Sequence, residues 1–94
     1  MLKIEKELNG DTLNIHISGR LDTITATDLE KEIEGFEGEN IVFDCDGLEY
    51  ISSAGLRVFL TTHKNTGSMV VKNVSETVYE ILEVTGFTDI LNIE

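Results

Sequence analysis

IVFDCDGLEYISSAGLRVFL, residues 41–60, joins a short apolar run to an amphipathic segment. The run Ile41–Phe43 is continuous and apolar, which is typical of a strand buried on both faces of a sheet. We expect a loop over Asp46–Ile51 and then a helix from Ser53 to Asn65. That helix has an apolar stripe of Leu56, Phe59, Leu60 and His63, and a polar stripe of Ser53, Arg57 and Thr61. Helical spacing therefore places one of two adjacent serines on the solvent side, where the helix begins.

Two segments of alternating apolar and polar residues precede this stretch. Their apolar members are Leu2, Ile4 and Leu8 in the first and Leu13, Ile15 and Ile17 in the second. Strict alternation predicts half-buried strands. Asn9-Gly10-Asp11 lies between them, and Asn-Gly favours a tight turn because both residues tolerate positive φ. The sequence therefore predicts an antiparallel hairpin.

A break at Gly19–Thr23 separates this hairpin from the first expected helix, Thr25–Glu34. Helical spacing predicts that its inward side carries Ala26, Leu29, Ile33 and Phe36. Gly35 is expected to stop the helix as a C′ glycine followed by a hydrophobic residue. A turn is expected at Glu37–Asn40.

The chain after residue 65 repeats the alternation of strand and helix. Asn65–Ser68 ends one helix and leads into an expected strand, Met69–Val71. Ser75 is expected to cap a third helix, and Gly86-Phe87 to stop it. The inward residues of that helix are expected to be Val78, Ile81, Leu82 and Val84. The tail Ile90–Ile93 either adds an edge strand or packs on the core.

The order strand-strand-helix-strand-helix-strand-helix predicts an α/β fold. We expect a mixed sheet of four to five strands packed against helices. The 94 residues fit one domain, and no repeat or low-complexity linker divides them. The sequence therefore predicts a single domain over residues 1–94.

The charge balance excludes some kinds of partner. The chain has 18 acidic and 7 basic residues and a net charge of −11, which disfavours nucleic acids and anionic membranes. The acidity either keeps a small protein soluble or steers it to a basic patch on a protein partner. Because the domain is short, acidic and without a coiled-coil pattern, we expect a monomer.

Composition also bears on compartment, cofactors and metals. The lone Cys45 is expected to be a small buried hydrophobe and cannot form an internal disulfide. No signal peptide or apolar stretch of membrane-spanning length is visible, so we expect the cytoplasm. One cysteine and two scattered histidines provide no metal site, and no cofactor is expected.

The two serines at the start of the central helix have two possible uses. Either Ser52 or Ser53 caps the helix by accepting a hydrogen bond from an unpaired N–H. Alternatively, the helix start holds an anion or a phosphate on Ser53, because free donors and partial positive charge gather there. Arg57 lies one turn later, and it either pairs with such a phosphate or is an ordinary solvated arginine.

The segment Asp44–Arg57, DCDGLEYISSAGLR, resembles the signature of STAS domains, the fold of anti-sigma factor antagonists. The hairpin start, the turn Gly19–Asp22 and the closing stretch Ser75–Phe87 match in the same order, so the resemblance covers nearly the whole chain. In the family motif an Asp precedes the phosphoacceptor serine, and a small residue, Gly and Leu follow it. The resemblance implies that Ser53 is the acceptor.

This sequence departs from the family motif at Ser52, which stands in the Asp position. Ser52 is a substitute cap, or phosphorylation differs in rate or has been lost. Asp22 matches an acidic residue that lies near the acceptor and the partner in the family; an Asp before a helix is also an ordinary cap. The residues that we expect to bind the partner are Asp22, Thr23, Ser52, Ser53, Ala54, Gly55 and Arg57.

The resemblance implies a partner switch. The unphosphorylated chain would bind an anti-sigma factor with a histidine-kinase-like ATPase fold and so release a sigma factor. Phosphorylation of Ser53 by that partner would expel the chain, and a serine phosphatase would restore it. The chain would be a substrate of these enzymes and not an enzyme itself.

Two other function classes remain open. A hydrolase would use Ser53 as nucleophile, but Ile51 replaces the first glycine of Gly-x-Ser-x-Gly, and neither His16 nor His63 is placed to act as the base. A STAS scaffold or sensor would bind a protein partner, a small anion or a nucleotide without sigma-factor control. Titration with nucleotides or anions would separate this class from the antagonists.

Overall fold

The computed structural model describes residues 1–36 and 39–94. The expected turn at Glu37–Asn40 falls partly outside the described residues, and Asn40 already belongs to a strand. The elements are β1 (Leu2–Asn9), β2 (Thr12–Leu21), α1 (Thr23–Ile33), β3 (Asn40–Asp44), β4 (Leu48–Ile51), α2 (Ser53–Asn65), β5 (Ser68–Lys72), α3 (Glu76–Val84), the 3-10 turn η1 (Phe87–Asp89) and β6 (Asn92–Ile93). The α/β class and the mixed sheet are confirmed.

The sheet has six strands, where four to five were expected. Five follow the order β1-β2-β3-β5-β6, and β4 pairs with β2 off this path. Among the strands of the described residues, only β1 is antiparallel to its neighbour. The chain's tail forms the edge strand β6, and the neighbouring Leu91 is buried.

The additional strand, β4, occupies the end of the segment that was expected to be a loop. Strand β2 is ten residues long, and β3 pairs only with its Thr12–His16 part. The remaining part, Gly19–Leu21, pairs with Leu48–Ile51. Gly19–Leu21, expected as a break, is therefore strand, and the register shift between Gly19 and Arg20 marks where the pattern is interrupted.

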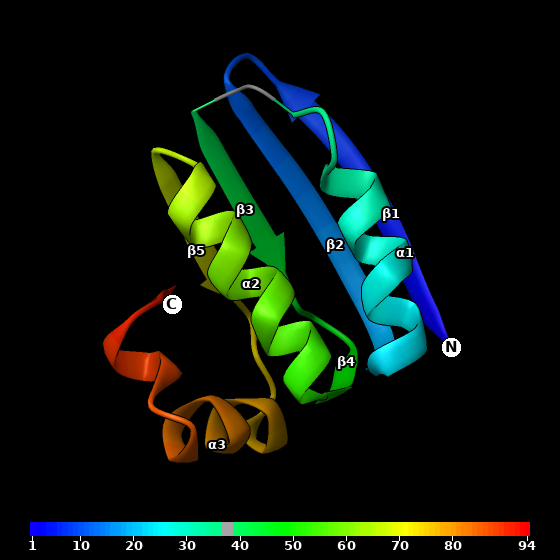
Figure 1. The fold of residues 1–94 in the computed structure, drawn as a ribbon, viewed down its shortest axis with the longest axis vertical. Helices are drawn as coiled ribbons and strands as arrows, with labels where there is room; N and C mark the ends of the chain where they lie inside the picture. The colour runs from blue at the N-terminus through cyan, green and yellow to red at the C-terminus, as the bar shows by residue number, and fades with distance from the viewer. Residues whose placement is uncertain (37–38) are drawn as a thin grey trace.

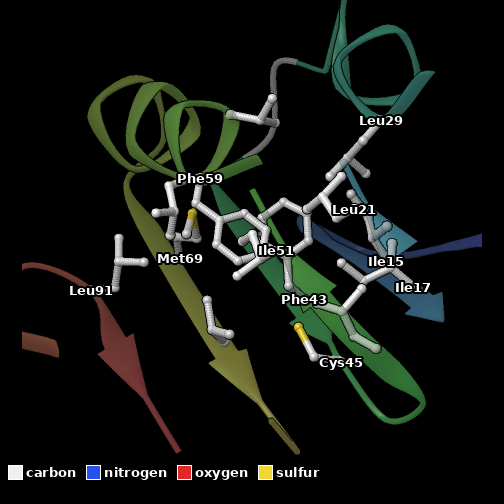
Figure 2. Packing of buried hydrophobic residues seen from close by; sticks show 14 of the residues in the cluster. Ile15, Ile17, Leu21, Leu29, Phe43, Cys45, Ile51, Phe59, Met69 and Leu91 are labelled. Atoms are coloured by element: carbon white, nitrogen blue, oxygen red, sulfur yellow. The ribbon is translucent and has the colours of Figure 1, made fainter. Parts of the chain in front are cut away.

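Helices α1 and α2 lie against one face of the sheet (Figure 1). The core forms between them and the inward residues of β2, β3 and β5, with the Phe43 and Phe59 rings 4.7 Å apart (Figure 2). Cys45 is fully buried in this core, as expected. Burial raises the pKa of its thiol to about 12.

The prediction that Ile41–Phe43 is buried on both faces was wrong. Ile41 and Phe43 are buried under the helices, but Val42 is only half-buried. The reason is that α1 and α2 cover one face, so the other face is partly exposed. The continuous apolar run reflects β propensity as well as burial.

The hairpin between β1 and β2 is confirmed, with its turn one residue later than expected. Asn9 stays in the ladder opposite Thr12, so Gly10-Asp11 forms a two-residue turn. Among these residues only Gly10 has a positive φ, of 61°. This geometry suits a turn that needs glycine at its first central position.

The predicted helices differ from the structure in the bounds of α1 and in the facing of Val84. Helix α2 spans Ser53–Asn65 as expected. Helix α1 begins at Thr23, two residues early, because Asp22 caps it, and ends at Ile33, one residue before the expected Glu34. Val84 was expected to face inward but is 77% exposed. It lies two residues beyond the buried Leu82, which is more than half a helical turn away from the inward side.

Candidate functional site

Two helices begin side by side at one end of the sheet. Leu21 and Ile51 are ladder partners at the ends of β2 and β4, and the Ser52 N–H donates to the Leu21 carbonyl at 2.8 Å. Asp22 and Ser52 directly follow these strand ends, and each is the N-cap of a helix. We call Asp22–Thr25 and Ser52–Leu56 the paired helix starts (Figure 1).

At the start of α2, Ser52 is the cap and Ser53 is exposed. The Ser52 hydroxyl accepts a hydrogen bond from the Gly55 N–H at 3.3 Å, and its carbonyl accepts from the Leu56 N–H at 2.9 Å. Ser53 is the first helical residue. Its hydroxyl forms no hydrogen bond with residues 1–36 or 39–94. Of the two serines, Ser53 is therefore the one with an unoccupied, accessible hydroxyl.

Gly55 lets α2 approach the strand ends closely. A Cβ atom at this position would lie 2.7 Å from the Leu21 side chain and 2.9 Å from the Ile51 side chain. Both neighbours are buried core residues. The glycine thus sets how closely the α2 start packs on the sheet, and with it the position of Ser53.

At the start of α1, Asp22 forms a complete capping box. Its carboxylate accepts hydrogen bonds from the Ile24 N–H at 3.0 Å and the Thr25 N–H at 2.9 Å. The Thr25 hydroxyl accepts from the Asp22 N–H and donates to the Arg20 carbonyl, both at 2.8 Å. The Thr25 N–H bond is the main reason that the pKa of Asp22 is lowered. Asp22 is thus an ionised cap.

The structure brings all the expected site residues to this end. Thr23 and Arg57 are exposed, and Ala54 is half-buried. Arg57 lies one turn after Ser53 on the same helix. Within the described parts of the chain Arg57 forms no ion pair, which leaves its guanidinium available.

Two features near this site were not found from the sequence. Ile24 is 79% exposed in the first turn of α1, and the Arg20 guanidinium stacks over the Tyr50 ring at 4.4 Å from its centroid. The first could have been found from helical spacing, because Ile24 falls outside the inward stripe of α1. The stacking of Arg20 on Tyr50 could not have been found, because it depends on the pairing of β2 with β4, and the residues of β4 were expected to form a loop.

The two histidines lie away from Ser53. His16 is on the partly exposed sheet face, where Nδ1 lies 3.3 Å from a Glu5 carboxylate oxygen and Nε2 lies 2.8 Å from the Asp46 carbonyl oxygen. The Asp46 carbonyl is the main reason that the pKa of His16 is raised. His63 is ten residues after Ser53 on α2, about 15 Å along the helix axis.

Neither a metal-ligand cluster nor a membrane-spanning helix is found in the part of the chain that the structure describes. Its His, Cys, Asp and Glu side chains form no group of three that could hold a metal ion. None of its helices has the length and apolar character needed to cross a membrane.

Comparisons with known proteins identify the family of this chain. A family model of the STAS domain matches residues 3–94. The chain is 28% identical to the anti-sigma-B factor antagonist of Listeria monocytogenes, covering 95% of this chain and 84% of the relative. It is 30% identical to the anti-sigma F factor antagonist of Paenibacillus polymyxa, covering 98% and 86%.

Two solved structures show the same fold. The anti-sigma factor antagonist SpoIIAA in its unphosphorylated form superposes with a TM-score of 0.84 at 20% identity, over 98% of this chain and 88% of that one. The phosphorylated form of the Bacillus cell fate determinant SpoIIAA superposes with a TM-score of 0.75 at 18% identity, over 98% and 91%. Because the family model covers nearly all of the sequence, the chain belongs to the STAS domain family.

Proposed function

We propose that this chain is an anti-sigma factor antagonist that changes partner when Ser53 is phosphorylated. The observation that carries the proposal is the exposed position of Ser53 at the start of α2 in a STAS domain, with a hydroxyl that forms no hydrogen bond to the described residues. Relatives that match almost the whole chain are named anti-sigma factor antagonists. Their names describe regulatory proteins, and we propose that this chain likewise is not an enzyme.

The proposed partner is an anti-sigma factor with a histidine-kinase-like ATPase fold, which is also the kinase. The Ser53 oxygen attacks the γ-phosphorus of ATP, a Ser–O–P bond forms, the bond to ADP breaks and the hydroxyl proton is released. A serine phosphatase hydrolyses the phosphoserine to serine and inorganic phosphate. The chain acts as a monomer in the cytoplasm. It needs no cofactor, because ATP is bound by the kinase.

Phosphorylation would expel the chain through electrostatics and desolvation. A phosphate adds about −1.5 to −2 charges to a chain whose net charge is already −11. Burying it without a partner costs several kcal/mol, and about 2.7 kcal/mol already weakens binding a hundredfold. In the free chain, the α2 start and Arg57 supply positive charge for the phosphate. Phosphorylation thus disfavours the complex more than the free protein.

The first test is the intact mass of the protein purified from its native cells, beside a Ser53→Ala variant. We expect a species heavier by about 80 Da, one phosphoryl group, that is absent from the variant. If that species never forms, or persists in the variant, Ser53 is not the acceptor. If the species persists in the variant, the acceptor would be Ser52. If it never forms, the chain would be a STAS scaffold or sensor that binds without modification.

The second test measures binding of purified variants to the anti-sigma factor. Ser53→Asp should weaken binding about a hundredfold or more. Thr61→Asp is the matched control, because Thr61 is also exposed and lies on the same side of α2, about 12 Å further along the helix. The control should bind within threefold of the wild type. Equal weakening by both changes would mean that overall charge, not the position of Ser53, governs binding.

A further inference from the structure

Ile24 is a large apolar residue exposed to solvent in the first turn of α1, at the same end of the sheet as the proposed phosphorylation site. It is 79% exposed, although it belongs to the first turn of α1. Its neighbours Thr25 and Ala26 face the core, so α1 turns Ile24 away from the protein's own interior. Single exposed apolar residues are common on protein surfaces, so exposure alone assigns no role. Its position and its rigidity distinguish Ile24.

Its position is set by the ladder that joins the paired helix starts. Leu21 and Ile51 are register partners, and Ser52 donates a hydrogen bond to Leu21. Ile24 follows Leu21 by three residues, and Ser53 follows Ile51 by two. The first turns of α1 and α2 therefore lie at the same end of the sheet (Figure 1). A partner that covers Ser53 can also reach Ile24.

Its rigidity comes from the capping box. The Ile24 N–H donates to the Asp22 carboxylate at 3.0 Å, and the next residue, Thr25, is tied to both Asp22 and Arg20. A β-branched side chain in a helix also has one strongly preferred rotamer. Little conformational entropy remains to be lost when such a side chain enters a pocket.

We propose that Ile24 is the apolar anchor of the surface that binds the anti-sigma factor. This inference rests on the proposed function. The partner surface must then contain an apolar pocket for one branched aliphatic side chain, next to the site that receives Ser53. An apolar anchor surrounded by polar residues is the usual arrangement of an energetically dominant contact. The exposed polar residues Thr23, Ser53 and Arg57 belong to the same two helices, α1 and α2.

The test compares two truncations of equally exposed residues. Ile24→Ala should weaken binding to the purified anti-sigma factor at least tenfold. Val84→Ala is the matched control, because Val84 is also β-branched and is 77% exposed, but it ends α3. It should change the affinity less than twofold. Both variants should have the same urea midpoint of unfolding as the wild type, since neither side chain is in the core.

Phosphorylation kinetics provide a second readout. If the anti-sigma factor is the kinase, Ile24→Ala should raise the KM for this chain at least tenfold and leave kcat within twofold of the wild type. Wild-type affinity and KM for Ile24→Ala would overturn the anchor but leave the proposed function intact. An equal loss from Val84→Ala would also overturn it. If the wild-type chain itself bound no anti-sigma factor, the proposed function would fail and the anchor with it.

Discussion

The two helix starts at the end of the sheet are built alike but capped very differently. Helix α1 is capped by the Asp22 carboxylate, which accepts two backbone hydrogen bonds and is part of a complete capping box. Helix α2 is capped by the Ser52 hydroxyl, which accepts one bond of 3.3 Å. The first turn of α2 contains no acidic residue. One start therefore already has a negative charge and the other does not.

This difference shows how two equivalent positions acquire different uses. An anionic cap neutralises the positive end of the helix dipole and occupies its free N–H groups. At α2 both remain largely available, and the adjacent Ser53 hydroxyl is where a phosphate would be attached. The strongly capped start supplies rigidity, and the weakly capped start is suited to receive charge.

The largest effect on stability should come from the third position after each cap. Thr25 at that position of α1 bonds to Asp22 and Arg20, whereas Gly55 in α2 leaves no room for a Cβ atom. Gly55→Ala should lower the free energy of unfolding by about 1–3 kcal/mol, because the helix start must move off the strand ends. Urea denaturation of this variant beside Ser53→Ala, which changes an exposed residue, measures it. Equal stability of the two variants would mean that the start of α2 does not pack against Leu21 and Ile51 closely enough to exclude a Cβ atom at position 55.

The caps themselves should differ in their dependence on pH. Ser52→Ala should lower stability by about 1 kcal/mol at every pH, because a hydroxyl does not titrate. Asp22→Ala should lower it by more at neutral pH. The folded-state pKa of Asp22 is below its ordinary value of 3.8, so its contribution is present above that value and is lost as the pH falls through the folded-state pKa.

The measurement is urea denaturation of both variants and the wild type between pH 7 and pH 3. The deficit of Asp22→Ala should shrink toward acid, while that of Ser52→Ala stays constant. Parallel curves for the two variants would show that the Asp22 cap works through its shape and not through its charge.

The fold was largely predictable from the sequence, because the spacing of apolar residues and the residues at turns and helix ends are local signals. The span of α2 and the hairpin before residue 21 follow from spacing and from turn residues. Strand β4 could not be predicted in this way. Its four residues are too short for a clear period, and their pairing depends on β2 being longer than β3. The half-exposed face of β3 could not be predicted either, because a continuous apolar run does not show which face of the sheet the helices cover.

The residues of the site were predictable from the sequence, but the contacts that bring them together were not. The motif around Ser53 identified the central helix start, and the family resemblance implied that Asp22 lies near it; the register between Leu21 and Ile51 shows why. Which of two serines caps the helix also needed coordinates, because both are common N-caps. Ile24 lies outside the inward stripe of α1, and helical spacing alone assigns no role to an exposed apolar residue.

The smallest expected effect comes from making the two caps alike. Ser52→Asp places a carboxylate at the cap of α2, where the STAS motif usually has one. A negative charge at a helix start contributes about 0.3–1 kcal/mol, so the variant should be slightly more stable at pH 7. This gain should disappear as the new carboxyl is protonated. Urea denaturation at pH 7 and pH 3 measures both effects, with Ser52→Asn as a control that caps without charge. If Asn stabilises the protein as much as Asp at pH 7, the Ser52 cap is weak because of its hydrogen-bond geometry. If only Asp stabilises it, the cap is weak because the start of α2 has no negative charge to balance its dipole. The second result is the one that the proposed phosphate on Ser53 requires.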